Sequence, residues 1–235
     1  MSGVTYSGYL RLPELLGAIR PLTPSHDRRT HSAEHFFIVA HQTSELWLRQ
    51  VLVDLDVAVH AIGVDRPAVA ADAVTRAANA VRLLADQVML LRALAPRDFA
   101  AFRDRLGNAS GAHSAQFRSL RSVLGVNRPE DEGALWTGLA AAAGRRATTV
   151  ADIYAEGGED NPLLRVAEAM ADLSQAYWAW QVGHVEVVRR AIGDARGTGR
   201  TSGAQYLAGR LGAPFPQLWE ARTRLHDGSS IPLPR

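Results

Sequence analysis

An uninterrupted stretch from Ser32 to Gly63 constrains the fold of this chain more than any other feature, because no proline and no internal glycine breaks it. Its apolar and small residues recur at spacings of three and four, which places them on one face of a helix. They are Phe37, His41, Ser44, Leu48, Leu52 and Leu55. His41 stands out on that face as a titratable ring. The stretch predicts one long helix with a histidine on its buried side. It also predicts an ion pair between Glu45 and Arg49 on a more exposed face of the helix.

A second long helix of the same character is predicted towards the other end of the chain. Asn161 and Pro162 form a strong helix start, since asparagine caps a helix and proline suits its first turn, and Gly193 ends it. Its apolar seam consists of Val166, Met170, Leu173, Tyr177, Trp180, His184 and Val188. A histidine again lies on the seam. A third long helix begins near Pro67, and its seam consists of Val74, Ala77, Val81, Leu84, Val88 and Leu91.

The remaining segments predict short helices joined by loops. The short helices are expected after Pro13, from Pro96 to Leu106, up to Leu124, from Ala134 to Ala143, and around Ile153, Tyr206 and Trp219. Residues 20–33 are expected to form a polar loop, and residues 228–235 a loose tail. No stretch alternates with a period of two for long enough to form a sheet. The predicted fold is therefore all-α, a helical bundle in a single domain spanning residues 1–235.

Composition narrows the classes of function. The chain has 235 residues and no cysteine, which excludes disulfides, iron–sulfur clusters and thiolate-bound metals. The net charge is +2 and no block of arginines or lysines forms, so we expect no nucleic-acid partner. No apolar run of about eighteen residues predicts a membrane span. The first residues lack a basic region followed by an apolar run, so the expected location is the cytoplasm.

The two seam histidines carry the first indication of function. A single such histidine is ordinarily a core residue with satisfied ring nitrogens. Two of them, His41 and His184, come from helices in different halves of the chain, and a bundle can hold a cofactor between facing side chains. A mononuclear metal would need a third protein ligand, but we expect no carboxylate on the same face near either histidine. This favours a haem over non-haem iron or zinc.

Five segments carry motifs in a defined order. They are Thr5-Tyr6-Ser7-Gly8-Tyr9-Leu10, the run from Phe37 to Trp47, Phe102-Arg103 with Ala109-Ser110-Gly111, the run from Trp180 to Gly193, and the glycine loop Gly197-Thr198-Gly199-Arg200-Thr201-Ser202-Gly203. Together they resemble the tryptophan 2,3-dioxygenase family, haem enzymes that open the indole ring. Residues 125–160 match none of the motifs of this family.

The resemblance implies a fold, a cofactor and partners. It implies a b-type haem held between core helices, with His184 as the iron ligand and with Ser110 and Gly111 near the haem. His41 would be the catalytic histidine that meets the indole nitrogen of L-tryptophan, and dioxygen would be the second substrate. The residues implied to bind the substrate are Phe37, Arg103, Thr198, Tyr6, Leu10 and Phe99. Residues 1–30 would form an arm packing on a neighbouring subunit, so the resemblance also implies a homodimer or homotetramer.

Departures from the family leave other functions open. The chain is shorter than typical members, mainly between Leu124 and Asn161, and Arg200 stands where the family usually has glycine. Gln181 and Gly183 replace arginines before His184. One alternative is therefore a haem monooxygenase that adds one oxygen to a tryptophan derivative in secondary metabolism. The others are a non-catalytic haem-binding protein and a helical interaction module without a cofactor.

Overall fold

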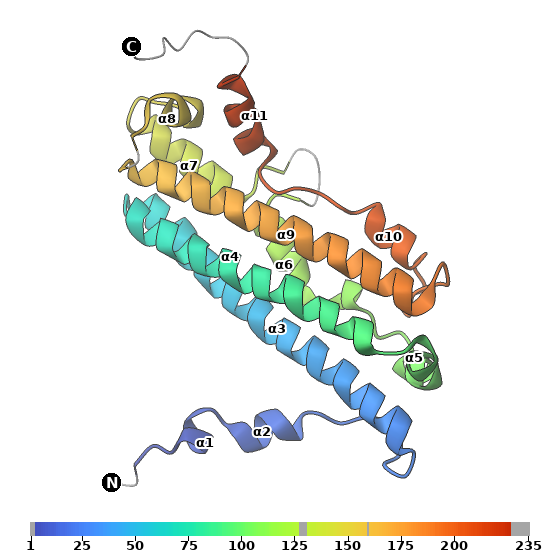
Figure 1. The fold of residues 1–235 in the computed structure, drawn as a ribbon. Coiled ribbons are helices and arrows are strands. Elements are labelled where there is room, and N and C mark those ends of the chain that lie inside the picture. Colours follow the sequence, from blue (N-terminus) through green and yellow to red (C-terminus); the bar gives the residue numbers. More distant parts are fainter. Residues whose placement is uncertain (1–2, 127–130, 159, 227–235) are drawn as a thin grey trace.

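Three long helices form the body of the molecule in the computed structural model, which describes residues 3–126, 131–158 and 160–226. They are α3 (Arg28–Gly63), α4 (Pro67–Leu90) and α9 (Pro162–Ile192), and they lie side by side in a bundle (Figure 1). Helix α4 packs most extensively against α9 and then against α3. Over the described residues all regular structure is helical, which confirms the predicted all-α class.

Local capping signals account for where the long helices begin and end. The Asn161 side chain accepts a hydrogen bond from the backbone N–H of Leu163 at the start of α9, as predicted. Gly193 ends α9 with φ of 58°, a left-handed value that glycine adopts readily. Helix α3 begins earlier than Ser32, because Asp27 caps it by accepting from the N–H of Thr30. The prediction of a loop through residue 33 was therefore wrong for residues 28–33.

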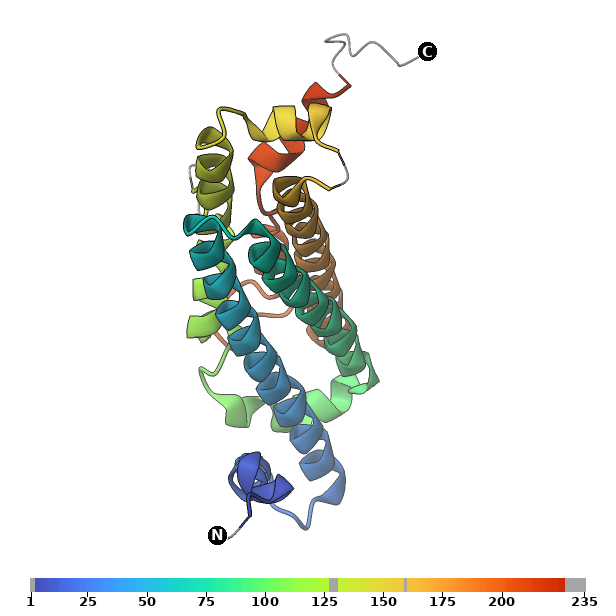
Figure 2. The same cartoon turned by 90° about the vertical axis from the view of Figure 1, so that its left-hand side faces the viewer.

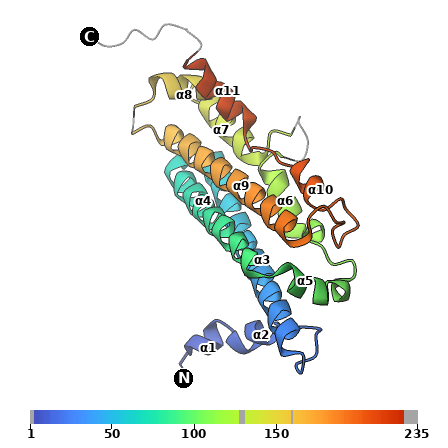
Figure 3. The same ribbon diagram turned by 45° about the vertical axis from the view of Figure 1, so that its right-hand side comes forward.

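Shorter helices cover the two ends of the bundle. They are α5 (Pro96–Arg103), α6 (Ala115–Val123), α7 (Ala134–Gly144), α8 (Val150–Glu156), α10 (Ala204–Ala208) and α11 (Pro216–Arg224), with 3-10 turns η1 (Leu91–Ala93), η2 (Asp104–Leu106) and η3 (Gly111–His113). Helices α7, α8 and α11 gather at one end of the bundle, and α5 and α10 lie towards the other (Figures 1 and 3). The predicted loose tail over residues 228–235 lies outside the described residues.

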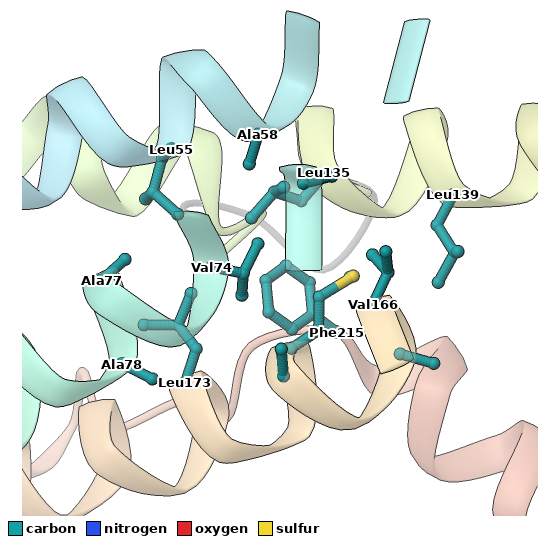
Figure 4. Close-up of a cluster of buried hydrophobic side chains, with 14 of the residues drawn as sticks. Leu55, Ala58, Val74, Ala77, Ala78, Leu135, Leu139, Val166, Leu173 and Phe215 are labelled. Carbon is teal, nitrogen blue, oxygen red and sulfur yellow. The ribbon is translucent and has the colours of Figure 1, made fainter. Parts of the chain in front are cut away.

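The core lies where α3, α4, α7 and α9 meet. Its face of α4 is rich in alanine, including Ala77 and Ala78, which lets the neighbouring helices approach closely (Figure 4). Leu55 of α3, Leu135 of α7 and Leu173 of α9 fill the space between the backbones (Figure 4). The predicted seam of α4 is buried from Val74 to Val88, and its last member, Leu91, is half-buried in η1.

The N-terminal segment lies apart from the bundle. Helices α1 (Tyr6–Tyr9) and α2 (Leu12–Gly17) extend beneath the start of α3, and their main packing is against each other (Figures 1 and 2). None of their residues is buried. The Gln42 side chain of α3 donates a hydrogen bond of 3.1 Å to the Ala18 carbonyl, just after α2. Most apolar side chains of this arm are therefore exposed within one chain.

In the described part of the chain, no helix is both long and apolar enough to cross a bilayer.

Candidate functional site

The two seam histidines lie at the same end of the bundle. His41 is in the first half of α3 and His184 is near the end of α9, and these two helices run in opposite directions (Figures 1 and 3). Burial lowers the pKa of His184 to about 4, and the charge of His41 adds to the shift. His184 is therefore neutral at neutral pH, which is the form that can bind a metal.

The backbone holds His41 in a defined tautomer. Its Nδ1 lies 2.7 Å from the Phe37 carbonyl oxygen, and because a carbonyl can only accept, Nδ1 carries the proton and donates it. The other ring nitrogen, Nε2, is then an acceptor. Burial lowers the pKa of His41, against opposing effects of the Phe37 carbonyl and of Glu45. The His41 residue is nevertheless exposed to solvent, so the prediction that it lies on the buried side of the helix was wrong.

Two predictions that concern Glu45 were wrong. It lies near enough to His41 to act on its pKa, so the expectation that no carboxylate shares that face is wrong. It also does not pair with Arg49. Instead, its carboxylate accepts a hydrogen bond of 2.8 Å from the amide of Gln116, which comes from α6.

An aromatic wall stands beside His41. The Phe37 ring lies 4.0 Å from the His41 ring, and 5.6 and 5.5 Å from the rings of Phe99 and Phe102 in α5, centroid to centroid. Phe99 and Phe102 meet edge to face at 5.4 Å. These separations are those of favourable aromatic pairs. The wall is therefore preorganised to hold a flat apolar ring next to the His41 imidazole.

Arg103 joins this wall to the glycine loop. It is the last residue of α5 and donates a hydrogen bond to the carbonyl of Arg196, directly before the loop. Arg103 and Phe99 also line an open hollow of about 460 Å³, together with Arg190 near the end of α9. No acidic side chain lines the hollow, and neither seam histidine does. The hollow therefore favours an anionic group beside the aromatic wall.

The glycine loop packs against the segment that contains Ser110. A side chain added to Gly199 would lie 2.9 Å from both side-chain atoms of Ser110, so only glycine permits this approach. Thr198, next to it, is half-buried, and Gly111 follows Ser110 in the turn η3. The structure thus brings Thr198 and Ser110 into one neighbourhood, although they are far apart in sequence.

Arg200 has an unusual backbone conformation within this loop. Its φ is 60°, a left-handed value that costs a non-glycine residue free energy, and its N–H donates a hydrogen bond of 3.1 Å to the Gly197 carbonyl. Glycine would adopt this conformation without strain. The arginine is exposed at the surface of the loop.

Two of the predicted site residues lie elsewhere, and two others were missed. Tyr6 and Leu10 belong to the exposed N-terminal arm, with 76% and 41% of their surface accessible. Phe102 was missed as part of the wall, although its spacing of three from Phe99 is a helical signal. Gln87 of α4 was also missed; its amide lies 2.8 Å from the Ala40 carbonyl oxygen and thereby braces the turn of α3 that carries His41.

Comparison with known proteins identifies the family. The family model described as tryptophan 2,3-dioxygenase matches residues 1–131 and 139–225. This chain belongs to the tryptophan 2,3-dioxygenase family. The resemblance drawn from the five motifs is confirmed, and so is its consequence that the chain belongs to a family of enzymes. The family model also matches residues 139–160, a segment that contains none of the five motifs.

Individual members of the family are similar over nearly their whole length. A protein named tryptophan 2,3-dioxygenase from Anaeromyxobacter sp. (strain K) is 34% identical, over 95% of this chain and 97% of its own. Proteins of the same name from Caulobacter vibrioides and Herpetosiphon aurantiacus are each 32% identical, over 94% of this chain and 98% of their own. The alignment with the Caulobacter protein spans 265 positions, so that protein has segments that this 235-residue chain lacks.

The residues present fit the haem that this family implies. Within residues 3–126, 131–158 and 160–226, no three His, Asp or Glu side chains form a group that could hold a metal ion by themselves. A haem needs only one or two ligands from the protein, because its macrocycle supplies the others. His184 is a neutral, partly buried imidazole near the end of α9 and would supply the one protein ligand. His41 would face it from α3.

Proposed function

We propose that this protein is a haem-dependent tryptophan 2,3-dioxygenase that opens the indole ring of L-tryptophan at C2–C3 with dioxygen, giving an N-formylkynurenine. The observation that carries the proposal is that His184 of α9 and His41 of α3 lie towards the same end of the bundle, where Phe37, Phe99 and Phe102 form an aromatic wall beside His41. A b-type haem bound through His184 would supply the activation of dioxygen. Ser110 and Gly111 would lie against this cofactor.

The chain's own residues would orient the substrate. His41 has its proton on Nδ1, so its Nε2 can accept a hydrogen bond from the indole N–H. Phe37 and Phe99 would hold the flat face of the indole. The guanidinium of Arg103 suits a two-pronged contact with the substrate carboxylate, and the Thr198 hydroxyl would contact the substrate ammonium. Such orientation lowers the barrier by holding the reacting ring in place.

We further propose a homo-oligomer, in which the N-terminal arm, residues 1–30, packs on a neighbouring subunit. The support is the exposed apolar surface of the arm, where Tyr6, Tyr9 and Leu16 each have more than half of their surface accessible. Tyr6 and Leu10 would then close the substrate site of the neighbour. Size-exclusion chromatography with light scattering should give a dimer or a tetramer, and an active monomer would refute the arrangement. The predicted cytoplasmic location stays a prediction.

A second candidate is a monooxygenase that acts on a tryptophan derivative. It is favoured by Arg200, which places a cation and a strained backbone in the glycine loop next to Thr198. The shorter length of this chain, compared with its relatives, also favours the monooxygenase. The complete set of Phe37, His41, Arg103, Ser110 and Thr198 favours ring opening, because it matches the motifs of the ring-opening enzymes.

Labelled dioxygen separates these functions. The purified protein, expressed with added haem, should be red, and a colourless protein would refute every haem-based function. Mass spectrometry of the product from tryptophan and from β-methyltryptophan should show two labelled oxygen atoms. A gain of one atom would establish the monooxygenase, and haem binding without turnover of either substrate would establish a non-catalytic haem protein.

A variant series tests the assignment of His184. His184→Ala should lose stable haem binding, because the α9 seam offers no thiolate and no other histidine to replace the imidazole. His60→Ala is the matched control, since His60 is an exposed histidine on α3 away from the site. Full haem content in His184→Ala would overturn the assignment.

A further inference from the structure

An aromatic ring of the preceding turn of α9 stacks on His184. Trp180 precedes His184 by one helical turn, and the two rings lie 5.8 Å apart with an angle of only 23° between their planes. This is an offset stack, which is a favourable arrangement for aromatic rings. The outer torsion angle of a histidine side chain is otherwise broad and poorly restricted. A fixed indole face therefore restricts the rotation of the His184 ring.

The indole of Trp180 is itself held from two sides. Phe117 of α6 lies 5.1 Å from it, and Tyr177, one turn earlier in α9, lies 5.9 Å from it. Tyr177 is completely buried, so it cannot turn away without opening the core. Trp180 packs against the same core. The stack on His184 therefore continues into the rigid part of the bundle.

The backbone of this turn is held as well. Gly183 lies so close to α4 that an added Cβ would be 3.2 Å from Met89 Sδ and 3.4 Å from Val88 Cγ1. The Gln181 amide donates a hydrogen bond of 2.9 Å to the Gly212 carbonyl. These two residues stand where the family usually has arginines. Helix α9 is therefore packed closely against α4 and joined to Gly212 at the turn that presents His184.

We propose that Trp180 is a positioning residue that fixes the ring plane of His184 and thereby sets the orientation and strength of its bond to the haem iron. The inference rests on the proposed function, since it requires His184 to be the protein ligand of the iron. It assigns Trp180 a role towards the cofactor that a core tryptophan would not have. Partners of this kind, which orient a metal ligand, commonly change affinity or activity by about 10- to 100-fold when removed.

The test compares the haem-loaded protein with Trp180→Leu, Trp180→Phe and Trp219→Leu. The readouts are the iron–histidine stretching band in the resonance Raman spectrum of the ferrous protein and the rate of haem transfer to apomyoglobin. Trp180→Leu should shift or broaden the band and speed haem loss by roughly 10- to 100-fold. Trp180→Phe keeps a flat ring and should restore most of both. Trp219→Leu removes a tryptophan packed on the same core, away from His184, and should lower thermal stability without moving the band.

Other outcomes decide against the proposal. A folded Trp180→Leu protein with an unchanged band and unchanged haem release would show that Trp180 only fills the core. If that variant does not fold, Phe117→Leu becomes decisive, because it removes the support of the indole and keeps the indole itself; an unchanged band there would equally overturn the proposal. Failure of the parent protein to bind haem through His184 would instead refute the proposed function.

Discussion

The attachment of the N-terminal arm to the bundle depends on Glu34. Its two carboxylate oxygens accept hydrogen bonds of 2.8 Å from the backbone N–H groups of Leu22 and Thr23, and both Glu34 and Thr23 are almost completely buried. Replacing Glu34 by glutamine keeps one acceptor and turns an N–H₂ group towards the other donor. One buried N–H then loses its partner, at a cost of about 1–3 kcal/mol.

The cost should appear as local opening more than as global unfolding. Helices α1 and α2 contribute no buried residue, so releasing the arm exposes little core beyond Thr23, whose carbonyl also lies 2.7 Å from His31 Nδ1. In Glu34→Gln the amide protons of Leu22 and Thr23 should therefore exchange with solvent about 5- to 140-fold faster, because 1.4 kcal/mol corresponds to a factor of ten. The melting temperature should change little. Hydrogen exchange followed by mass spectrometry or NMR measures the difference.

A matched control and the pH dependence sharpen the test. Glu14→Gln changes an exposed glutamate paired with Arg11 at the surface and should leave exchange at Leu22 and Thr23 unaltered. Burial raises the pKa of Glu34, but its contacts with Thr23 and with the N–H of Leu22 outweigh burial and hold the pKa below 4.5. The stabilisation is thus complete above pH 4.5 and is lost as the pH falls through the lowered value. Unchanged exchange in Glu34→Gln would refute the reasoning.

Three further substitutions test the site. Arg103→Ala should weaken tryptophan binding by on the order of 2–5 kcal/mol, with partial recovery in Arg103→Lys, and equal affinity of the parent enzyme for tryptophan and tryptamine would contradict the carboxylate contact. His41→Ala should retain haem, measured by its Soret absorbance, and lower kcat by up to about 100-fold; an unchanged kcat would exclude an orienting role. Arg200→Gly removes a left-handed non-glycine residue and should stabilise by about 1 kcal/mol, seen as a melting temperature about 2–4 °C higher. A lower melting temperature would show that the Arg200 side chain makes stabilising contacts.

The sequence by itself determined the helices and the residue types of the site. The Asn161 cap, Pro162, Pro67 and Gly193 act within a few residues of themselves, so the bounds they predict agree with the structure. The spacing of three and four placed His41 and His184 on the apolar faces of two long helices, although the structure leaves His41 exposed. The ordered motifs were specific enough to indicate the family, which the comparison with known proteins confirms.

Local signals were also misread where two of them competed. Prolines at positions 21 and 24 favoured a loop up to residue 33, whereas the Asp27 cap starts α3 at Arg28. The spacing of Glu45 and Arg49 suits an ion pair, yet Glu45 binds Gln116, which comes 71 residues later. An exposed pair of this kind is worth only a few tenths of a kcal/mol, so a partner from a packed helix displaces it easily.

Only the tertiary structure decided which side chains meet. The approach of Gly199 to Ser110, the contact of Arg103 with Arg196 and the brace from Gln87 to α3 all join segments far apart in the chain. The tertiary structure alone also decided that the N-terminal arm is largely exposed and that Trp180 lies between His184 and the core. Periodicity states which face of a helix is apolar, but not which helix covers it. That choice depends on the close packing of α3, α4 and α9, which is a property of the whole chain.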